Sequence, residues 1–373
     1  MLQEAVRRTQ ECWPEAVVTV LTDDPDGLRR HCPGAVAMST EGRAGLPSPA
    51  GRGRFRSSLL ARSGGRDLAA SITSSDVVLA SGGGGTTDLF PDDGRSLLAV
   101  LGLAARAGVC TAMVSQGFGP LEDPGLDRLA RSVLPRVDFI AIRDRVTAPA
   151  LLQRLGVHEA RIHVTGDDGI RAARQHTRQE LGSDLGVNVR LAAYAGIDDQ
   201  VAADVGTESR RAGERLGARL RVIPIDLDPV HGDGAVTVRV CAMDQAGGPQ
   251  STDPSTIMSA AGDCRVVVTT SYHAAVFALA QGVPAVGVAA STYYSEKFRG
   301  LADLFGDGSE VVLVSPGWRE RLAGAVDAAW HRAAQLRPPL LQAADMQVAL
   351  ADRGYATLRE VAEQAVRRRH RAP

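Results

Sequence analysis

The sequence predicts an α/β protein with two doubly wound, Rossmann-like domains. Short β-branched runs alternate with helical patterns along the whole chain, and most runs are apolar on both faces, which is typical of parallel strands covered by helices. The chain has 373 residues, more than one core usually organises. We expect one domain over 1–172 and a second over 173–340, facing each other across a cleft. A C-terminal helix and basic tail over 341–373 should pack back on the first domain.

The elements follow in chain order. Apolar β-branched runs between turn residues predict strands at 17–21, 76–80, 111–115, 138–142, 161–165, 220–225, 265–270, 285–288 and 310–314. Apolar residues every three or four positions predict helices near 2–13, 95–107, 125–134, 146–155, 198–217, 273–281, 296–305, 317–335 and 340–370.

Three segments lie outside this pattern. The polar stretch 171–188 is the expected linker, and the arginine- and glycine-rich stretch 42–67 is expected to be a flexible loop or a basic loop that holds an anionic acceptor. The tail 367–373 is interpreted as a basic helix end. The chain opens with a helix where a doubly wound domain normally opens with a strand, so we expect a further strand upstream of Met1.

Composition excludes several classes of protein. The formal net charge is -1, and aromatic residues make up 4% of the chain, which argues against a nucleic-acid partner. Five scattered cysteines favour reduced thiols over a disulfide framework or a zinc site. The uncharged stretch 266–295 is interrupted by polar residues and Pro284, so it is interpreted as a strand, a helix and a strand rather than a membrane span. No apolar leader is visible, and we expect a cytoplasmic protein.

Two glycine-rich segments follow strands of the first predicted domain. Gly83, Gly84 and Gly85 lie in a run that ends at Asp88, and Gln116 and Gly117 follow the next strand. Glycines at the carboxyl ends of parallel strands let a ligand approach the backbone closely. Neither segment has the spacing of a dinucleotide fingerprint or a P-loop. Alone, the first segment is equally well a tight structural turn, but two such segments at neighbouring strand ends favour a ligand site.

Charged residues follow the next two strands. Arg143 ends one strand, where it could bind a carboxylate or phosphate, or form a salt bridge with Asp138 or Asp144. Asp167 and Asp168 end the following strand. These acids could ligate a metal, accept hydrogen bonds from sugar hydroxyls or cap a helix, and capping is the simplest of these interpretations.

The second predicted domain has its most informative residues around one histidine. Ser271, Tyr272 and His273 follow a strand and open a helix made of small residues. A histidine there can donate a proton, although a lone histidine is more often structural. Lys297, the only lysine of the chain, is predicted at the start of the next helix. A cation there opposes the helix dipole, so we expect an anion to offset it.

The ordered set of motifs resembles the polysaccharide pyruvyl transferase family. The matching segments are 82–88, 116–121, 142–144, 164–167, 271–278 and 282–284, followed by Lys297. The resemblance implies two Rossmann-type domains in a glycosyltransferase-B-like arrangement. It also implies transfer of pyruvate from phosphoenolpyruvate to two sugar hydroxyls as a cyclic ketal, with no cofactor. By position, Arg143 and Lys297 match donor-binding residues, and His273 matches the proposed general acid.

The sequence departs from the family at two places. Many members have arginine two residues before the histidine, where this chain has Ser271, so one phosphate contact is absent or supplied elsewhere. The family's N-terminal strand and its glycine- and asparagine-rich loop are also absent. Two alternatives therefore stay open: a nucleotide-sugar-dependent glycosyltransferase of the same shape, and a non-catalytic relative that binds sugar or phosphate.

Overall fold

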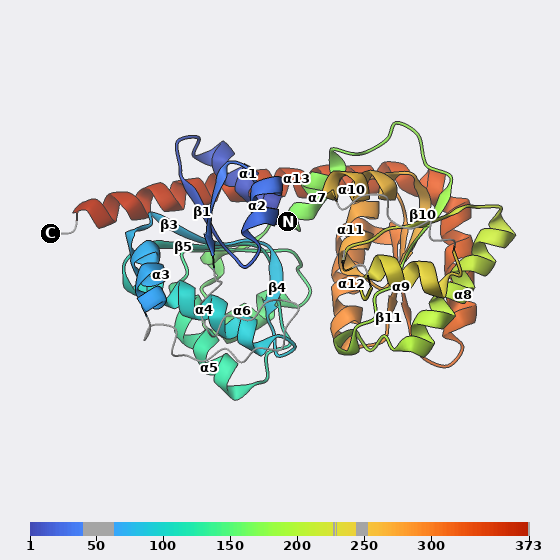
Figure 1. Ribbon diagram of the computed structural model, residues 1–373, viewed down its shortest axis with the longest axis horizontal. Helices are drawn as coiled ribbons and strands as arrows, with labels where there is room; N and C mark the ends of the chain where they lie inside the picture. The colour runs from blue at the N-terminus through green and yellow to red at the C-terminus, as the bar shows by residue number, and fades with distance from the viewer. Residues whose placement is uncertain (40–62, 227, 229, 244–252, 372–373) are drawn as a thin grey trace. The chain divides into compact units, whose positions relative to one another are not determined.

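The structure is a computed structural model that describes residues 1–39, 63–226, 228, 230–243 and 253–371. The chain forms two compact units (Figure 1). Unit 1 comprises Met1–Arg143, Thr147–Asp168 and Leu350–Pro373, and unit 2 comprises Asp144–Val146 and Gly169–Ala349. Apart from residues 144–146, the chain passes into unit 2 between residues 168 and 169, near the start of α7 (Asp168–Arg174), and returns to unit 1 between residues 349 and 350.

Unit 1 is built around parallel strands. Its strands are β1 (Val18–Thr22), β2 (Ala35–Ser39), β3 (Val77–Ala80), β4 (Gly83–Thr86), β5 (Cys110–Phe118), β6 (Phe139–Ile142) and β7 (Ile162–Val164). Its helices, besides the end of the last one, are α1 (Leu2–Cys12), α2 (Pro25–His31), α3 (Ser63–Ser74), α4 (Pro91–Arg106), α5 (Pro124–Val133) and α6 (Ala148–Arg154). The main sheet has the order β3-β5-β6-β7, with β4 also paired to β5, and β1 pairs with β2 in a separate sheet.

Alternate residues of the central strands of unit 1 face two different layers. Met113 of β5 and Ile140 of β6 are buried with apolar residues of α4, α5 and α6. Their neighbours Ala112 and Phe139 face the other way, toward Tyr355 and the C-terminal helix. This alternation is why the strands are apolar on both faces. The C-terminal helix packs back on the first unit, as the sequence predicts.

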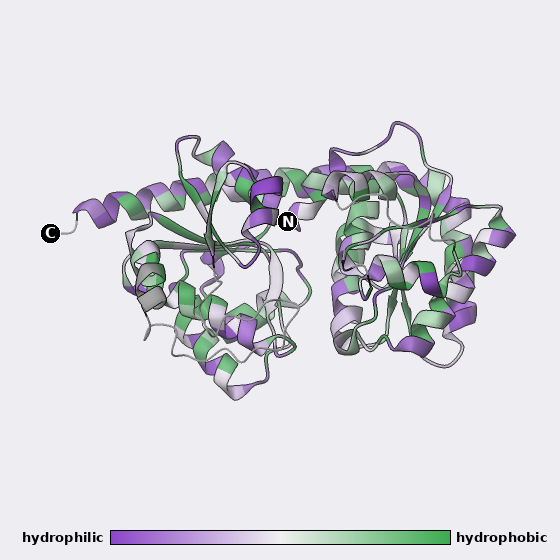
Figure 2. Cartoon of the chain, viewed as in Figure 1, coloured by the Kyte–Doolittle hydropathy of each residue, from purple (hydrophilic) through white to green (hydrophobic). Residues whose placement is uncertain are grey.

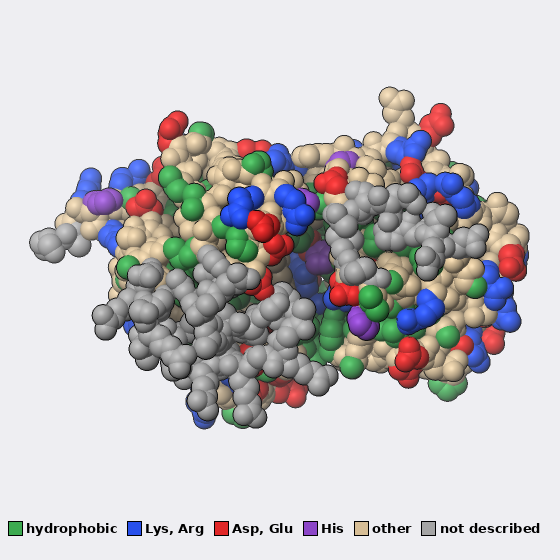
Figure 3. All heavy atoms as spheres, viewed as in Figure 1, with side chains coloured by type: hydrophobic (Ala, Val, Ile, Leu, Met, Phe, Trp, Pro, Cys, Tyr) green, Lys and Arg blue, Asp and Glu red, His purple; other side chains and the backbone are tan. Residues whose placement is uncertain are grey.

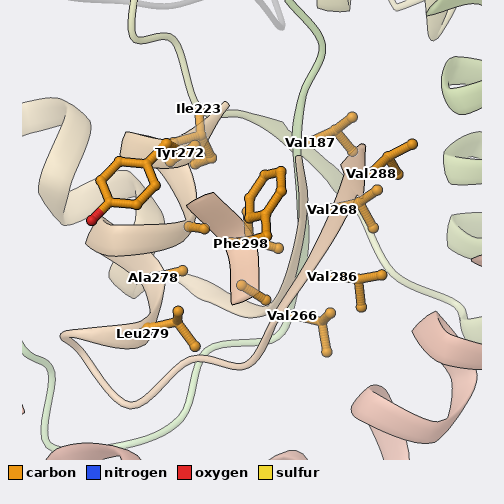
Figure 4. Packing of buried hydrophobic residues seen from close by; sticks show 14 of the residues in the cluster. Val187, Ile223, Val266, Val268, Tyr272, Ala278, Leu279, Val286, Val288 and Phe298 are labelled. Carbon is orange, nitrogen blue, oxygen red and sulfur yellow. The ribbon is translucent and has the colours of Figure 1, made fainter. Parts of the chain in front are cut away.

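Unit 2 is a second doubly wound unit. Its strands are β8 (Asp184–Asn188), β9 (Leu220–Val222), β10 (Cys264–Thr269), β11 (Ala285–Ala289) and β12 (Ser309–Leu313), in the parallel order β12-β11-β10-β8-β9. Its helices are α8 (Asp199–Leu216), α9 (Asp233–Val240), α10 (Pro254–Gly262), α11 (Tyr272–Leu279) and α12 (Thr292–Phe305). Figure 2 shows the apolar strands at its centre, and in the core view of Figure 4 the ring of Phe298 lies among apolar side chains of the strands. A Cβ on Gly287 would lie 2.6 Å from that ring, so glycine there makes room for Phe298 to anchor α12.

The chain ends in one long helix, α13 (Trp318–Arg371), where the sequence predicts two. Pro338 and Pro339 lie inside it and remove two backbone donors. The neighbouring Leu336 and Leu340 are buried in the core of unit 2. Arg337 donates to the carbonyl oxygens of Gln281, at 3.0 Å, and Arg178. These contacts hold the helical path through the prolines.

The structure corrects several other expectations. The predicted linker 171–188 contains β8, which pairs with both β9 and β10 and is therefore a central strand of unit 2. Strands β2 and β4 and helices α2, α3, α7, α9 and α10 were not predicted. Of the predicted loop 42–67, residues 42–62 lie outside the described residues, and 63–67 begin α3.

The cysteines lie mostly in the interior, and charged side chains lie on the surface. Four of the five free cysteines are buried, and Cys12 is half-buried. On the face drawn in Figure 3, acidic and basic side chains are interspersed. Among the described residues, no helix combines the length and the apolar character needed to cross a membrane.

Candidate active site

The glycine run of unit 1 forms an edge strand rather than a loop. Gly83 pairs with Gln116 and Thr86 with Phe118, with a register shift between the two pairs. A Cβ on Gly83 or Gly85 would meet no atom closer than 3.9 Å. Packing therefore does not require glycine at these two positions. The missing side chains leave the backbone accessible, as close approach of a ligand would need.

Two polar side chains beside this strand bind the backbone. The carboxylate of Asp88 accepts hydrogen bonds from the N–H groups of Glu122 (2.5 Å) and Asp123 (3.1 Å). The buried amide of Gln116 donates to the carbonyl oxygens of Ala80 and Val114, at 3.2 and 3.1 Å. Asp88 thus fixes the loop at residues 122 and 123, and Gln116 joins the end of β3 to β5.

Arg143 follows β6 directly, as predicted, and it is 4% exposed. Its backbone N–H donates to the carbonyl oxygen of Gln116, and its Nη1 lies 3.6 Å from Oδ2 of Asp167. A Cβ on Gly117 would lie 2.6 Å from Nη2 of this guanidinium. The second glycine segment therefore makes room for the arginine. The geometry brings Arg143, Gly117 and Asp167 together at the carboxyl edge of the unit 1 sheet.

Asp168, which follows Asp167 directly, has an environment different from that of Asp167. Asp168 is buried, its N–H donates to Oγ of Ser115, and its Oδ2 accepts a hydrogen bond from the Tyr355 hydroxyl at 3.0 Å. Burial, reinforced by the charge of Asp167, raises the pKa of Asp168 to about 7. Ser115 adopts a left-handed conformation with φ 57°, close to a register irregularity between β5 and β6. Sequence reasoning missed Tyr355 because it is 187 positions from Asp168.

We expect Asp168→Asn to stabilise the protein at pH 8 and to flatten its pH dependence. The unfolded carboxyl titrates near ~3.9, whereas the folded pKa is about 7. Between these values the unfolded chain binds fewer protons, so this group lowers stability as the pH rises from about 4 to about 7 and adds no further change above that. Each pKa unit corresponds to about 1.4 kcal/mol.

Thermal denaturation of wild type and variant at pH 5 and pH 8 measures this effect. The variant's advantage in Tm should grow between the two pH values. Parallel pH profiles would contradict the assignment of a neutral Asp168 in the folded protein.

In unit 2, the ends of β8 and β10 are joined by polar contacts just before the histidine. Thr270 N–H donates to the carbonyl oxygen of Asn188, and Oγ1 of Thr269 accepts the N–H of Ser271 at 2.8 Å. Ser271 is the N-cap residue of α11, although its hydroxyl makes no capping hydrogen bond. These contacts fix the first turn of α11 at the carboxyl edge of the sheet.

His273 is the second residue of α11, as predicted. Its ring is half-buried between two aromatic side chains, with centroid distances of 5.3 Å to Tyr272 and 6.3 Å to Phe277. Tyr272 itself is buried in the core of unit 2. The imidazole is therefore held by its neighbours at the start of a helix, where backbone N–H groups favour negative charge.

The structure corrects the expected position of Lys297. Helix α12 begins at Thr292 after the N-cap Ser291, so Lys297 lies in the second turn and not at the helix start. Its ammonium group is 3.9 Å from the ring centroid of Tyr293 and 5.1 Å from that of Tyr294. Cation–π contacts hold this ammonium in place. Because Lys297 lies beyond the first turn, the helix dipole opposes its charge less than the sequence suggests.

The predicted site residues are divided between the units. Gly83, Gly84, Gly85, Asp88, Gln116, Gly117, Arg143 and Asp167 belong to unit 1, and Ser271, Tyr272, His273 and Lys297 belong to unit 2. In both units they lie on or after the carboxyl ends of parallel strands, where open α/β sheets bind ligands. Within the described ranges, no group of three or more His, Cys, Asp or Glu side chains could hold a metal ion.

Two Rossmann-like units define the class of fold. The chain is similar to a putative UDP-N-acetylglucosamine 2-epimerase from Listeria monocytogenes, with a TM-score of 0.60 and 15% identity over 91% of this chain and 86% of that one. It is also similar to a glycosyltransferase from Rickettsia africae, with a TM-score of 0.57 and 10% identity over 97% and 93% of the two chains. These similarities show the GT-B-type fold.

The sequence identifies the family within that fold. The model of the polysaccharide pyruvyl transferase family matches residues 10–292, and the chain belongs to this family. The match includes Arg143 and His273 and ends five residues before Lys297. A search of curated protein sequences gives no significant match.

Proposed function

We propose that this protein transfers pyruvate from phosphoenolpyruvate to two hydroxyls of a sugar, glycan or specialised-metabolite acceptor, as a ketal, in polysaccharide biosynthesis or related metabolism. The observation that carries the proposal is His273 in the first turn of α11, within the segment that matches the family. Phosphoenolpyruvate needs a proton donor of moderate acidity, and a positioned imidazole can supply one.

In the proposed reaction two acceptor hydroxyls add in turn to the same carbon of the donor. His273 donates a proton to the methylene carbon of phosphoenolpyruvate, which makes the adjacent carbon electrophilic. One acceptor hydroxyl adds to that carbon, and inorganic phosphate leaves with the electron pair of its C–O bond. The second hydroxyl then adds and closes the ketal, and the protons released by the two hydroxyls restore His273 and the phosphate. In this scheme the donor supplies the carbon skeleton and carboxylate of the transferred group, and His273 supplies the third methyl hydrogen, so we propose that no further cofactor takes part.

Arg143 and Lys297 are the proposed ligands of the donor's anionic groups. A guanidinium can bind a carboxylate or phosphate through two parallel hydrogen bonds, and an ammonium acts as a compact charge. The buried position of Arg143 strengthens its electrostatic effect. Its contact with Asp167 orients the guanidinium over Gly117.

We expect Gly117→Ala to weaken phosphoenolpyruvate binding about tenfold, because the new Cβ would overlap the Arg143 guanidinium, as the 2.6 Å approach shows, and the loss of one charge-assisted contact costs roughly this much. Isothermal titration calorimetry measures the affinity. Gly324→Ala is the control, since no atom lies within 4 Å of its Cβ position. Equal affinity of the two variants would exclude Arg143 as a donor ligand.

Release of inorganic phosphate from phosphoenolpyruvate tests the function. The protein is incubated with the donor and a panel of sugars, glycans and nucleotide-linked sugars, with each acceptor omitted in turn. Phosphate release that depends on one acceptor supports the proposal. Release of a nucleoside diphosphate without phosphoenolpyruvate would favour a glycosyltransferase instead. Donor binding without phosphate release with any acceptor would indicate a binding protein.

A further inference from the structure

Arg190 lies in unit 2 close to the residues that precede His273. It follows β8, the neighbour of β10 in the sheet. Its backbone N–H donates to Oγ1 of Thr270 at 2.7 Å, and Thr270 directly precedes Ser271. The sequence alone does not distinguish Arg190, since the chain is rich in arginine and no motif surrounds this position.

Arg190 interacts electrostatically with Tyr194 and Tyr294, and Tyr294 is one of the two rings beside the Lys297 ammonium. Burial lowers the pKa of Arg190, but the charges of Tyr194, Tyr294 and nearby acidic groups outweigh burial, so the pKa lies above its usual value. The ring of Tyr294 lies 6.1 Å from that of Tyr194 and 5.1 Å from the Lys297 ammonium. Tyr294 is therefore a neighbour of both cations, one from the loop after β8 and one from the helix after β11.

The acidic neighbours of Arg190 leave it able to bind a further anion. Its Nη2 is 3.4 Å from Oδ2 of Asp226, a long contact to a half-exposed side chain. Asp233 is buried, and burial raises the pKa of its carboxyl group. Its Oδ1 is already hydrogen-bonded to the N–H groups of Ile225 and Asp226. The Arg190 side chain is 32% exposed, so an incoming anion can reach it and replace the weak partner Asp226.

We propose that Arg190 binds one anionic group of the phosphoenolpyruvate donor and acts together with Lys297. This inference rests on the proposed function. With Arg143 and Lys297 as the ligands proposed above, each anionic group of the donor has one cation, and a phosphate carries more negative charge than one ammonium balances. Ser271 cannot supply a positive charge, whereas Arg190 reaches the same strand edge from β8. In this proposal the Arg190 side chain supplies the phosphate contact that Ser271 cannot make.

Calorimetric titration with phosphoenolpyruvate, without acceptor, tests the role of Arg190. We expect Arg190→Gln to weaken binding about 10–100-fold, the range for loss of a charge-assisted hydrogen bond. Arg190→Lys keeps the charge but loses the planar fork, so its affinity should lie between those of wild type and the glutamine variant. Arg265→Gln is the matched control. Arg265 lies in β10 near the opposite end of the strand, where its Nε donates to the Trp330 carbonyl oxygen.

The outcomes separate this inference from the proposed function. If wild type does not bind phosphoenolpyruvate, the proposed function fails. If wild type binds the donor and a folded Arg190→Gln variant binds it equally well, the role of Arg190 is wrong and the function stands. If Arg190→Gln shows no thermal unfolding transition, the affinity of Arg190→Lys tests the proposal in its place. Wild-type affinity of Arg190→Lys would then show that the guanidinium has no role in donor binding.

Discussion

His273→Gln should lower turnover about 10²–10⁴-fold, the usual contribution of a general acid, while phosphoenolpyruvate affinity changes little. Glutamine preserves approximate size and polarity but cannot donate a proton of moderate acidity. The ring of His273 contacts Tyr272 and Phe277 but is itself only half-buried, so the variant should fold. Initial rates of phosphate release and calorimetric titration with the donor measure the two quantities separately.

The same substitution at His176 is the control. This residue is in unit 2, after α7, and its Nδ1 lies 3.2 Å from Oγ of Ser259 in α10. His176→Gln should keep wild-type turnover. If His273→Gln also keeps it, the histidine is structural and the proposed mechanism has no proton donor.

Lys297→Arg should weaken donor binding about tenfold although it keeps the positive charge, and Lys297→Gln should weaken it more. The ammonium is placed by its contacts with the rings of Tyr293 and Tyr294. A planar guanidinium is larger and presents its donors in a fixed fork, so it cannot reproduce the same point charge. Titration of each variant with phosphoenolpyruvate gives the affinities.

Chemical labelling offers an independent measurement at the same residue. Lys297 is the only lysine of the chain, so an amine-selective reagent reports on it once the N-terminus is blocked. Saturating phosphoenolpyruvate should slow the labelling. Equal labelling with and without donor, together with full affinity in Lys297→Arg, would remove Lys297 from the site.

Much of the fold follows from local pattern, and the exceptions have physical reasons. Strand β8 lies at the end of the stretch 171–188, whose polar character predicts a linker. A Cβ on Gly186 would lie 2.8 Å from Sγ of Cys264 and from Cγ2 of Val267, so packing against β10 requires glycine in a central strand. The contact that identifies it as a strand comes from residues about 80 positions further along the chain, and no local pattern carries that information.

The site shows the same division between local and distant information. Arg143 and His273 were placed correctly, because each directly follows a strand or opens a helix. Lys297 was placed at a helix start because the predicted helix began near residue 296, whereas Ser291 caps the actual helix. Two further residues near the strand ends could not be predicted, because Tyr355 reaches Asp168 and Arg190 reaches Thr270 through tertiary contacts.

Product analysis in D₂O tests the central claim, pyruvyl transfer by proton donation to the donor's methylene group. Phosphoenolpyruvate and an active acceptor are incubated with the protein, and the product is examined by mass spectrometry and NMR. If His273 protonates the donor before transfer, the acceptor gains one pyruvate less one water, with a single deuterium in the new methyl group. Two products would contradict pyruvyl transfer by this route. One is an acceptor that carries a sugar in place of pyruvate, and the other is an enolpyruvyl ether that keeps the donor's carbon–carbon double bond.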